Sequence, residues 1–295
     1  MDDRPVMGLI AGGGRLPFLQ AQGMREAGYR VACVGLDGQY DADLPGACDH
    51  FSRAGVLQIG RWARALRRAG AQRAVMVGRV EKSHLLYHPL ACFRLLPSWR
   101  VVKLFFWDLR KDRRSQGMLS AVAAELLKVG VELVDTTQYI PEHLATPGVL
   151  TSCQPSSSVR RDIDFAWPIL MRMNDLDIGQ AVAVKNGDVV AVEAIEGTDA
   201  MIARAGELSR GGGWVLAKGA PPSKDPRFDV PTIGTQTIAN LKSAGGVALV
   251  VAAGKVILLD KPEVIAAADA AGIALVGMDA AGSEDSAGVS KVADA

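Results

Sequence analysis

The sequence predicts an α/β protein with an N-terminal Rossmann-like parallel-sheet domain and a C-terminal α+β domain that contains hairpins. Composition is the first reason, because 49% of the 295 residues are hydrophobic, only 5% are aromatic and 32 are glycine. This mixture is typical of α/β proteins with short turns. Strand and helix patterns alternate in the first half, which favours βαβ units. In the second half an Asn-Gly pair separates two alternating apolar runs, which indicates a hairpin.

The first half reads as strands joined by helices long enough for parallel crossovers. The helix at 58–72 is amphipathic, because Ile59, Trp62 and Leu66 share one face. The expected elements are a strand and glycine turn at 6–14, a helix at 16–28, a strand at 29–36, a helix at 58–72, a strand at 73–80, and a helix followed by a strand within 118–135.

The predicted division assigns 1–140 to a Rossmann-like nucleotide-binding domain and 161–280 to a catalytic α+β domain. Three prolines and a serine run make 141–160 a linker or crossover. The Ala-, Gly- and Ser-rich stretch 281–295 is expected to be a flexible tail.

The second half mixes helices with hairpins. Asn186 and Gly187 should form a hairpin turn, and Thr198 should cap a helix that has Asp199 in its first turn. The expected elements are a helix from 162 capped by Asp162 or Asp164, a hairpin at 180–197, a helix at 198–209, a strand at 211–218, a helix at 232–245, a second hairpin at 247–259 and a helix at 260–272.

Charge and cysteine usage narrow the classes of function. The formal net charge is +1, so no overall field attracts nucleic acid or a membrane. Four cysteines, at 33, 48, 92 and 153, show no CxxC spacing and are expected to be free thiols in a reducing compartment. The N-terminus lacks a leader pattern, and Lys255 breaks the longest apolar stretch, so we expect a cytoplasmic protein.

The first candidate site is the turn "AGGGRLP". Gly12, Gly13 and Gly14 follow a strand and precede a helix, so their amides could meet a phosphate. Asp37 lies about where a dinucleotide fold places its ribose-binding acid, although Pro17 stands where the fingerprint needs glycine. The alternative is a tight turn that serves packing only.

The second candidate site is "VEAIEGTDAMIARAG". Glu193 lies among apolar strand positions, so its carboxylate needs a basic residue or a metal ion beside it. Glu196, Thr198 and Asp199 lie near the start of the following helix, where they could equally be simple helix caps.

The third candidate site is the loop "LAKGAPPSKDPRFDVPTIG". Four prolines restrict its backbone, which suits a loop that holds charged groups in place. Lys218 and Arg227 could neutralise a diphosphate, and Asp225 or Asp229 could bind Mg²⁺ or orient a water. A solvated connector with a structural salt bridge is the alternative.

Segment 84–114 concentrates aromatic, lysine and arginine residues. It is either an amphipathic helix packed on the sheet or a surface for an acyl chain or an anionic membrane face. His84 and His88 are four apart, but Pro89 follows at once, so a metal site is not expected there.

Four stretches together resemble one family: "AGGGRLP", "LDIGQAVAVKNG", "VEAIEGTDAMIARAG" and "DPRFDVPTIG". They are similar to the LpxI-type UDP-2,3-diacylglucosamine pyrophosphatases of lipid A biosynthesis, in register over nearly the whole chain. The resemblance implies hydrolysis to lipid X (2,3-diacylglucosamine 1-phosphate) and UMP, stimulated by Mg²⁺, with Asp225 as the catalytic carboxylate. Lys224 departs from the family pattern, so no role is carried over to it.

The resulting hypothesis assigns catalysis to Asp225, Lys218 and Arg227, and metal binding to Asp225 with Glu193. Residues expected to bind the UDP and phosphate portion are Gly12, Gly13, Gly14, Arg15, Leu16, Arg79, Thr198 and Asp199. The resemblance also implies a homodimer, and a substrate with two fatty chains implies contact with the cytoplasmic face of the inner membrane. No nucleic-acid partner is expected.

Two alternatives belong to other classes. An NAD(P)-dependent oxidoreductase would use the glycine turn and Asp37, but it gives the charged residues of the second half no task. A nucleotide-binding regulator without turnover would make Asp225 structural only.

Overall fold

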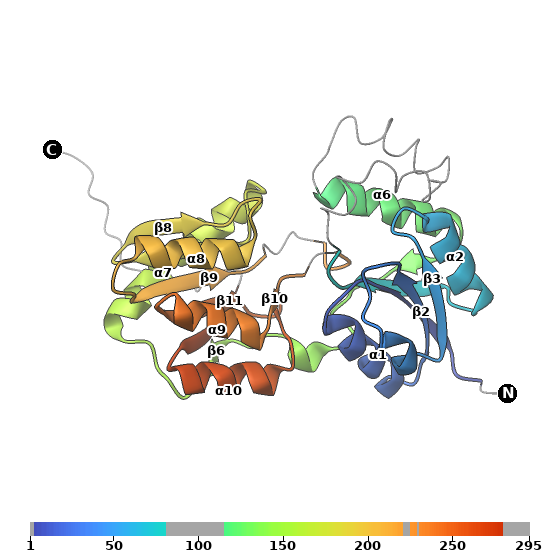
Figure 1. Cartoon of the computed structure of the whole chain (residues 1–295), viewed down its shortest axis with the longest axis horizontal. Coiled ribbons are helices and arrows are strands. Elements are labelled where there is room, and N and C mark those ends of the chain that lie inside the picture. Colours follow the sequence, from blue (N-terminus) through green and yellow to red (C-terminus); the bar gives the residue numbers. More distant parts are fainter. Residues whose placement is uncertain (1–2, 81–114, 221–224, 229, 280–295) are drawn as a thin grey trace. The chain divides into compact units, whose positions relative to one another are not determined.

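The structure is a computed structural model that describes residues 3–80, 115–220, 225–228 and 230–279. The chain forms two compact units (Figure 1). Unit 1 runs to Pro141 and also contains Asp225–Asp229, and unit 2 contains the remainder from Glu142. Segment 225–228 therefore packs with unit 1, although the chain on both sides of it belongs to unit 2.

Five parallel strands form the sheet of unit 1, in the order β3-β2-β1-β4-β5. At its centre β1 (Val6–Ala11) pairs with β2 (Arg30–Leu36) on one side and β4 (Arg73–Val77) on the other. The edges are β3 (His50–Ala54) and β5 (Glu132–Leu133). This order confirms the expected Rossmann-like sheet, and the strand order reverses between β1 and β4.

Helices cover both faces of this sheet, which explains why its central strand is a continuous apolar run. Leu9 shares a buried cluster with residues of α1 (Leu16–Glu26). Ile10 points the other way and shares a cluster with α2 (Ile59–Arg68) and α6 (Ser115–Lys128). Two short 3₁₀ helices complete the connections, η1 (Leu44–Ala47) and η3 (Pro141–His143).

Unit 2 contains a mixed six-stranded sheet in the order β6-β13-β11-β9-β7-β8. Its three central strands run parallel, and a hairpin and a short strand extend it in antiparallel fashion. The strands are β6 (Gly148–Val149), β7 (Ala181–Lys185), β8 (Asp188–Val192), β9 (Trp214–Lys218), β11 (Gly246–Ala252) and β13 (Ala274–Met278), while β10 (Thr232–Ile233) and β12 (Ile257–Leu258) form a separate parallel pair. The predicted α+β character of this half is confirmed.

The helices of unit 2 divide between the two sheet faces (Figure 1). α7 (Ser157–Asp175) packs against β7, β9 and β11. On the other face lie α8 (Thr198–Leu208), α9 (Thr235–Ser243) and α10 (Lys261–Ala271), with α9 in contact with both of its neighbours. Trp214 is fully buried in the core between these layers.

The hairpin predicted at Asn186 and Gly187 is confirmed, and both residues have positive φ, 54° and 76°. Such a turn suits the twist of the strands that it joins. The carboxylate of Asp162 accepts from both amides, at 2.9 and 2.8 Å. The predicted capping by Asp162 or Asp164 is wrong, because the helix begins earlier, at Ser157, and Ser156 is its N-cap.

Two other local predictions are wrong. The second hairpin, at 247–259, does not form, since β12 pairs with β10 instead of β11. Thr198 is the first residue of α8 and Gly197 is the N-cap, with no side-chain cap. The strand β3 was missed because its sequence, "HFSRA", is polar and largely exposed at a sheet edge.

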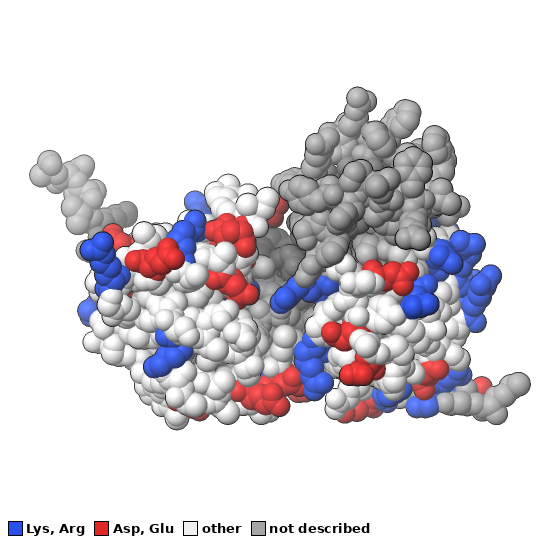
Figure 2. All heavy atoms as spheres, in the orientation of Figure 1, with Lys and Arg blue, Asp and Glu red and all other residues white. Residues whose placement is uncertain are grey.

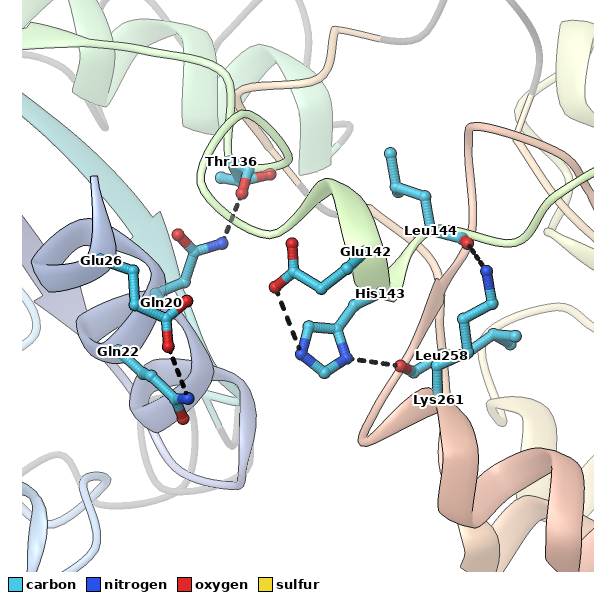
Figure 3. Close-up of polar contacts among 9 residues, drawn as sticks. All are labelled: Gln20, Gln22, Glu26, Thr136, Glu142, His143, Leu144, Leu258 and Lys261. Atoms are coloured by element: carbon cyan, nitrogen blue, oxygen red, sulfur yellow. Dashed lines mark hydrogen bonds and ion pairs between the residues drawn. The ribbon is translucent and has the colours of Figure 1, made fainter.

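The start of unit 2 is held by two side-chain contacts (Figure 3). His143 Nδ1 lies 3.2 Å from the carbonyl oxygen of Leu258, and Lys261 Nζ donates to the carbonyl of Leu144 at 2.8 Å. These contacts attach the chain just after Pro141 to β12 and to the start of α10.

Surface charge is mixed in sign over both units on the face seen in Figure 2, as the net charge of +1 predicts. No helix among the described residues is long and apolar enough to cross a bilayer. Cys33, Cys48 and Cys153 are free, as predicted. Cys92, the 84–114 segment with His84 and His88, and the tail at 281–295 lie outside the described residues.

Candidate active site

The glycine turn lies at the carboxyl edge of the unit 1 sheet, between β1 and α1. Gly12 donates to the carbonyl of Val77 at 2.9 Å, and Gly13 exchanges two hydrogen bonds with Arg79, at 3.0 and 2.9 Å. The loops that leave β1 and β4 are therefore paired where the strand order reverses. In open α/β sheets this is where ligands bind. Arg15, the N-cap of α1, and Leu16, its first residue, continue the same edge.

Backbone packing explains two of the three glycines. A Cβ atom on Gly12 would lie 2.5 Å from the carbonyl oxygen of Arg79, and one on Gly13 would lie 2.5 Å from that of Gln39. Gly14 needs its φ of +94°. The amide of Gly14 donates to Asp41 Oδ2 at 2.8 Å. A carboxylate of the chain itself therefore contacts one of the three amides that the sequence assigned to a phosphate.

Asp225 lies in a tight turn formed by residues 225–228, called here the Asp225 turn. Phe228 N donates to the carbonyl of Asp225 at 3.2 Å. Arg227 holds the Asp225 carboxylate through Nε, at 3.0 and 3.1 Å, and through Nη2 at 2.6 Å, and its own amide adds a bond of 3.0 Å. Two predicted catalytic residues are therefore in direct contact.

The Asp225 turn is attached to the edge of unit 1 that carries the glycine turn. Thr136 follows β5 closely, and both its amide and its hydroxyl donate to the carbonyl of Pro226. Phe228 is only 2% exposed and belongs to the same buried cluster as Ile10 of β1. Since β1, β4 and β5 are neighbours, their carboxyl ends gather the glycine turn, Arg79 and the Asp225 turn on one edge.

The hydrogen bond from the Arg227 side chain is the largest cause that lowers the pKa of Asp225. The Arg227 amide and positive charge act in the same direction, while partial burial opposes them. The carboxylate therefore stays ionised over the whole neutral range. An ionised carboxylate suits charge stabilisation or metal binding better than proton abstraction.

Replacing Arg227 with methionine should raise the pKa of Asp225 toward the ordinary range of aspartic acid. Because folding depresses this pKa, the pair stabilises the native state above the unfolded-state pKa, and the effect is lost as the pH falls through the folded-state value. The stability difference between wild type and the variant should therefore shrink in acid. NMR titration of the Asp225 carboxyl carbon measures the shift, and an unchanged pKa in the variant would contradict it.

In unit 2, strand register brings two predicted residues onto one face. Ala181 of β7 pairs with Lys218 at the end of β9. On its other side the amide of Glu193 donates to the carbonyl of Ala181 at 2.9 Å, just after β8 ends. Directly paired residues share a sheet face, so the small Ala181 lies between a lysine and a glutamate.

Thr198 connects these two side chains. Lys218 Nζ donates to Thr198 Oγ1 at 2.8 Å, and the same hydroxyl donates to Glu193 Oε1 at 2.9 Å. Lys218 and Glu193 are only 6% and 5% exposed. Glu193 Oε2 is buried and has no hydrogen-bond partner among the described residues. The sequence predicted either a basic residue or a metal ion near Glu193, and Lys218 is joined to Glu193 through the Thr198 hydroxyl.

Asp199 and Glu196 do not join this Lys218–Thr198–Glu193 group in the described structure. Each accepts hydrogen bonds from other residues of unit 2. Asp199 accepts from Asn240 of α9 at 2.9 Å. Glu196 accepts from Arg204 at 2.7 Å and from the amide of Ala194 at 3.0 Å. No group of three or more His, Cys, Asp or Glu side chains in the described part of the chain could hold a metal ion alone.

The sequence missed two polar residues at the edge of unit 1. Thr136 is 2% exposed and Gln20, on α1, is completely buried. Gln20 Nε2 donates to the carbonyl of Thr136 (Figure 3). Neither residue belongs to a recognisable motif. The only sequence signal is a glutamine on the buried face of an amphipathic helix, which is unusual for so polar a side chain.

These features define a two-domain α/β protein with a Rossmann-like N-terminal domain. Family models agree: the LpxI N-terminal domain matches residues 6–143 and the LpxI C-terminal domain matches residues 146–276. A curated relative from Caulobacter vibrioides, named UDP-2,3-diacylglucosamine pyrophosphatase LpxI, is 34% identical over 284 residues, which cover 92% of this chain and 97% of the relative. The chain belongs to the LpxI family, as its sequence motifs predicted.

The likeness to solved structures is weak. Two biotin carboxylase domains of 2-oxoglutarate carboxylase are similar, one of them from Hydrogenobacter thermophilus. Their TM-scores are 0.22 and 0.23, at 15% and 11% identity. The matches cover 62% and 60% of this chain but only 35% and 46% of those chains.

Proposed function

We propose that this protein hydrolyses the diphosphate of UDP-2,3-diacylglucosamine to UMP and lipid X in lipid A biosynthesis. The observation that carries the proposal is membership of the LpxI family along both domains. Family membership does not support the two alternative functions, an NAD(P)-dependent oxidoreductase and a nucleotide-binding regulator. A water oxygen attacks the sugar-side phosphorus, the bond from that phosphorus to the bridging oxygen breaks, and the bridging oxygen leaves with UMP.

The described residues support a division of tasks. The edge of unit 1 offers Arg79 and the first turn of α1 to the nucleotide phosphate. The Lys218 ammonium and the Arg227 guanidinium offset diphosphate charge. Asp225 stays ionised because of Arg227, and it either orients the attacking water or holds a metal ion.

Mg²⁺ fits this arrangement as a partner of the substrate. It usually keeps several waters and binds one or two carboxylates plus substrate phosphates, without a full protein cage. Asp225 supplies an ionised carboxylate that can be one such protein ligand. When bound, the ion would neutralise charge that develops on the phosphate oxygens.

The test is turnover in ¹⁸O-labelled water. Purified protein and UDP-2,3-diacylglucosamine in detergent micelles should release UMP and lipid X in equal amounts, with the label in the lipid X phosphate. EDTA should suppress the reaction and added Mg²⁺ should restore it. Label in UMP would place the attack on the other phosphorus, and no turnover by folded protein would refute the proposed function.

We also propose cytoplasmic residence with peripheral contact at the inner membrane, and a homodimer. The substrate's two acyl chains place it at a bilayer surface. Unit 2 exposes apolar side chains that suit such contact, among them Leu176, Ile178 and Ile195. Co-sedimentation with vesicles tests the membrane contact, and analytical ultracentrifugation tests the dimer.

Replacing Asp41 with alanine should tighten UMP binding by about threefold to tenfold. The change frees the Gly14 amide for a phosphate oxygen and removes a negative charge from its vicinity. Calorimetric titration with UMP measures the effect, and Asp43→Ala, at an exposed neighbouring position, is the matched control. Weaker binding in Asp41→Ala would mean that Asp41 itself contacts the ligand.

A further inference from the structure

The carbonyl of Pro226 is held by two donors from one residue. Thr136 N lies 3.2 Å and Thr136 Oγ1 lies 2.9 Å from that oxygen. Pro226 directly follows Asp225, and a proline restricts the backbone of the residue before it. Fixing this carbonyl therefore fixes the direction in which the chain presents Asp225.

Within the Asp225 turn, Asp225 has little freedom of its own. Arg227 grips both carboxylate oxygens, and the amide of Phe228 closes the turn on the Asp225 carbonyl. The turn therefore behaves as one rigid piece. Its described attachments to unit 1 are the bonds at Pro226 and the buried ring of Phe228.

Thr136, which holds the Asp225 turn, is itself fixed by neighbouring side chains. Asp135 Oδ1 accepts from the amide and the hydroxyl of Thr137, both at 2.7 Å, which shapes the loop around Thr136. Gln20 then donates from Nε2 to the carbonyl of Thr136. Gln20 lies one helical turn after Leu16, so the series of contacts ends at the helix that begins next to the glycine turn.

Stability alone does not account for Gln20. Its side chain is completely buried and Oε1 has no partner in the described structure. A buried unsatisfied oxygen is costly, and an apolar side chain of similar length would avoid that cost. A residue that is retained at a cost to stability points to a role in function.

We infer that Gln20 and Thr136 are positioning residues that align the Asp225 turn with the glycine turn. The inference rests on the proposed function, because it concerns the geometry of that reaction. Gln20 links α1 to Thr136, and Thr136 in turn holds the Pro226–Arg227 peptide, whose carbonyl lies one residue after Asp225. A displacement of about 1 Å at a catalytic carboxylate is enough to lower turnover by up to about 100-fold.

Isosteric variants test the inference. Gln20→Met and Thr136→Val each remove one donor and keep the side-chain volume. We expect kcat to fall about tenfold in each, with little change in KM or in the Kd for UMP, and Gln20→Met should melt at or above the wild-type temperature because it removes the unsatisfied oxygen. Thr136→Ser keeps the hydroxyl and should stay within about twofold of wild type. Gln22→Met is the matched control, since Gln22 lies exposed on the same helix and donates to Glu26 of that helix (Figure 3).

A second readout does not depend on turnover. Hydrogen exchange at the Phe228 amide, which closes the Asp225 turn, should be about tenfold faster in Thr136→Val and unchanged in Gln22→Met. If wild type fails to hydrolyse the substrate, the proposed function is wrong, and the exchange rates still report whether Thr136 holds the turn. Wild-type kcat and exchange in both Gln20→Met and Thr136→Val would overturn the inference. An equal loss of kcat in Thr136→Ser would overturn it too.

Discussion

The substitution Asp225→Asn should lower kcat about 1,000-fold or more, while the protein still folds and binds its substrate. The variant keeps the size of the side chain and an oxygen that can accept from Arg227. It loses the negative charge, which Arg227 preserves in the wild type by lowering the pKa of Asp225. Charge that stabilises a transition state or holds Mg²⁺ cannot be supplied by an amide.

Steady-state release of UMP gives kcat and KM for the variant, and circular dichroism shows whether it is folded. Asp188→Asn, at an exposed position where β8 begins, makes the same chemical change outside the predicted site residues and should leave both parameters unchanged. A variant at 225 that keeps more than a tenth of the wild-type kcat would show that Asp225 is only structural. In that case the Arg227 pair would serve to shape the turn.

The sequence predicted the layers of the fold well, because buried parallel strands and amphipathic helices leave strong periodic patterns. The prediction failed where a strand pairs with a partner that is not its neighbour in the sequence. The run at 247–259 has the alternation of a hairpin, yet its second strand pairs with β10, which is far away in sequence. A local pattern cannot report such a partner.

Capping predictions failed for a related reason. Thr198 stands at the start of a helix and is a good cap by residue type, but its hydroxyl lies between Lys218 and Glu193. Asp162 is also a good cap by type, and the structure uses it to hold a hairpin turn. In both cases the side chain makes a long-range polar contact and therefore does not cap the helix.

The candidate site was only partly visible in the sequence. The charged residues at 193, 218, 225 and 227 could be named, because charge in an apolar or rigid context is conspicuous. Gln20 and Thr136 could not be named, because their significance lies in contacts made across more than 80 residues of chain. Only the folded chain shows that these uncharged residues hold the Asp225 turn.

The substitution Lys218→Met should lower kcat/KM about 100-fold to 1,000-fold and should also destabilise the protein. The buried ammonium would no longer offset the diphosphate. It would also no longer balance the buried carboxylate of Glu193, which it reaches through Thr198. Removing one partner of a buried charged pair costs about 3–5 kcal/mol, because the other charge is left uncompensated.

The two effects can be separated by adding Glu193→Gln to Lys218→Met. The double variant removes the orphaned charge, so urea unfolding should show most of the lost stability restored, in a double-mutant cycle with the two single changes. Hydrolysis should stay as low as in Lys218→Met, because the substrate still meets no cation at the end of β9. Recovery of activity together with stability would mean that Lys218 serves only to neutralise Glu193. Loss of activity that persists in the stable double variant, while Glu193→Gln alone stays active, would place the Lys218 ammonium in the reaction itself.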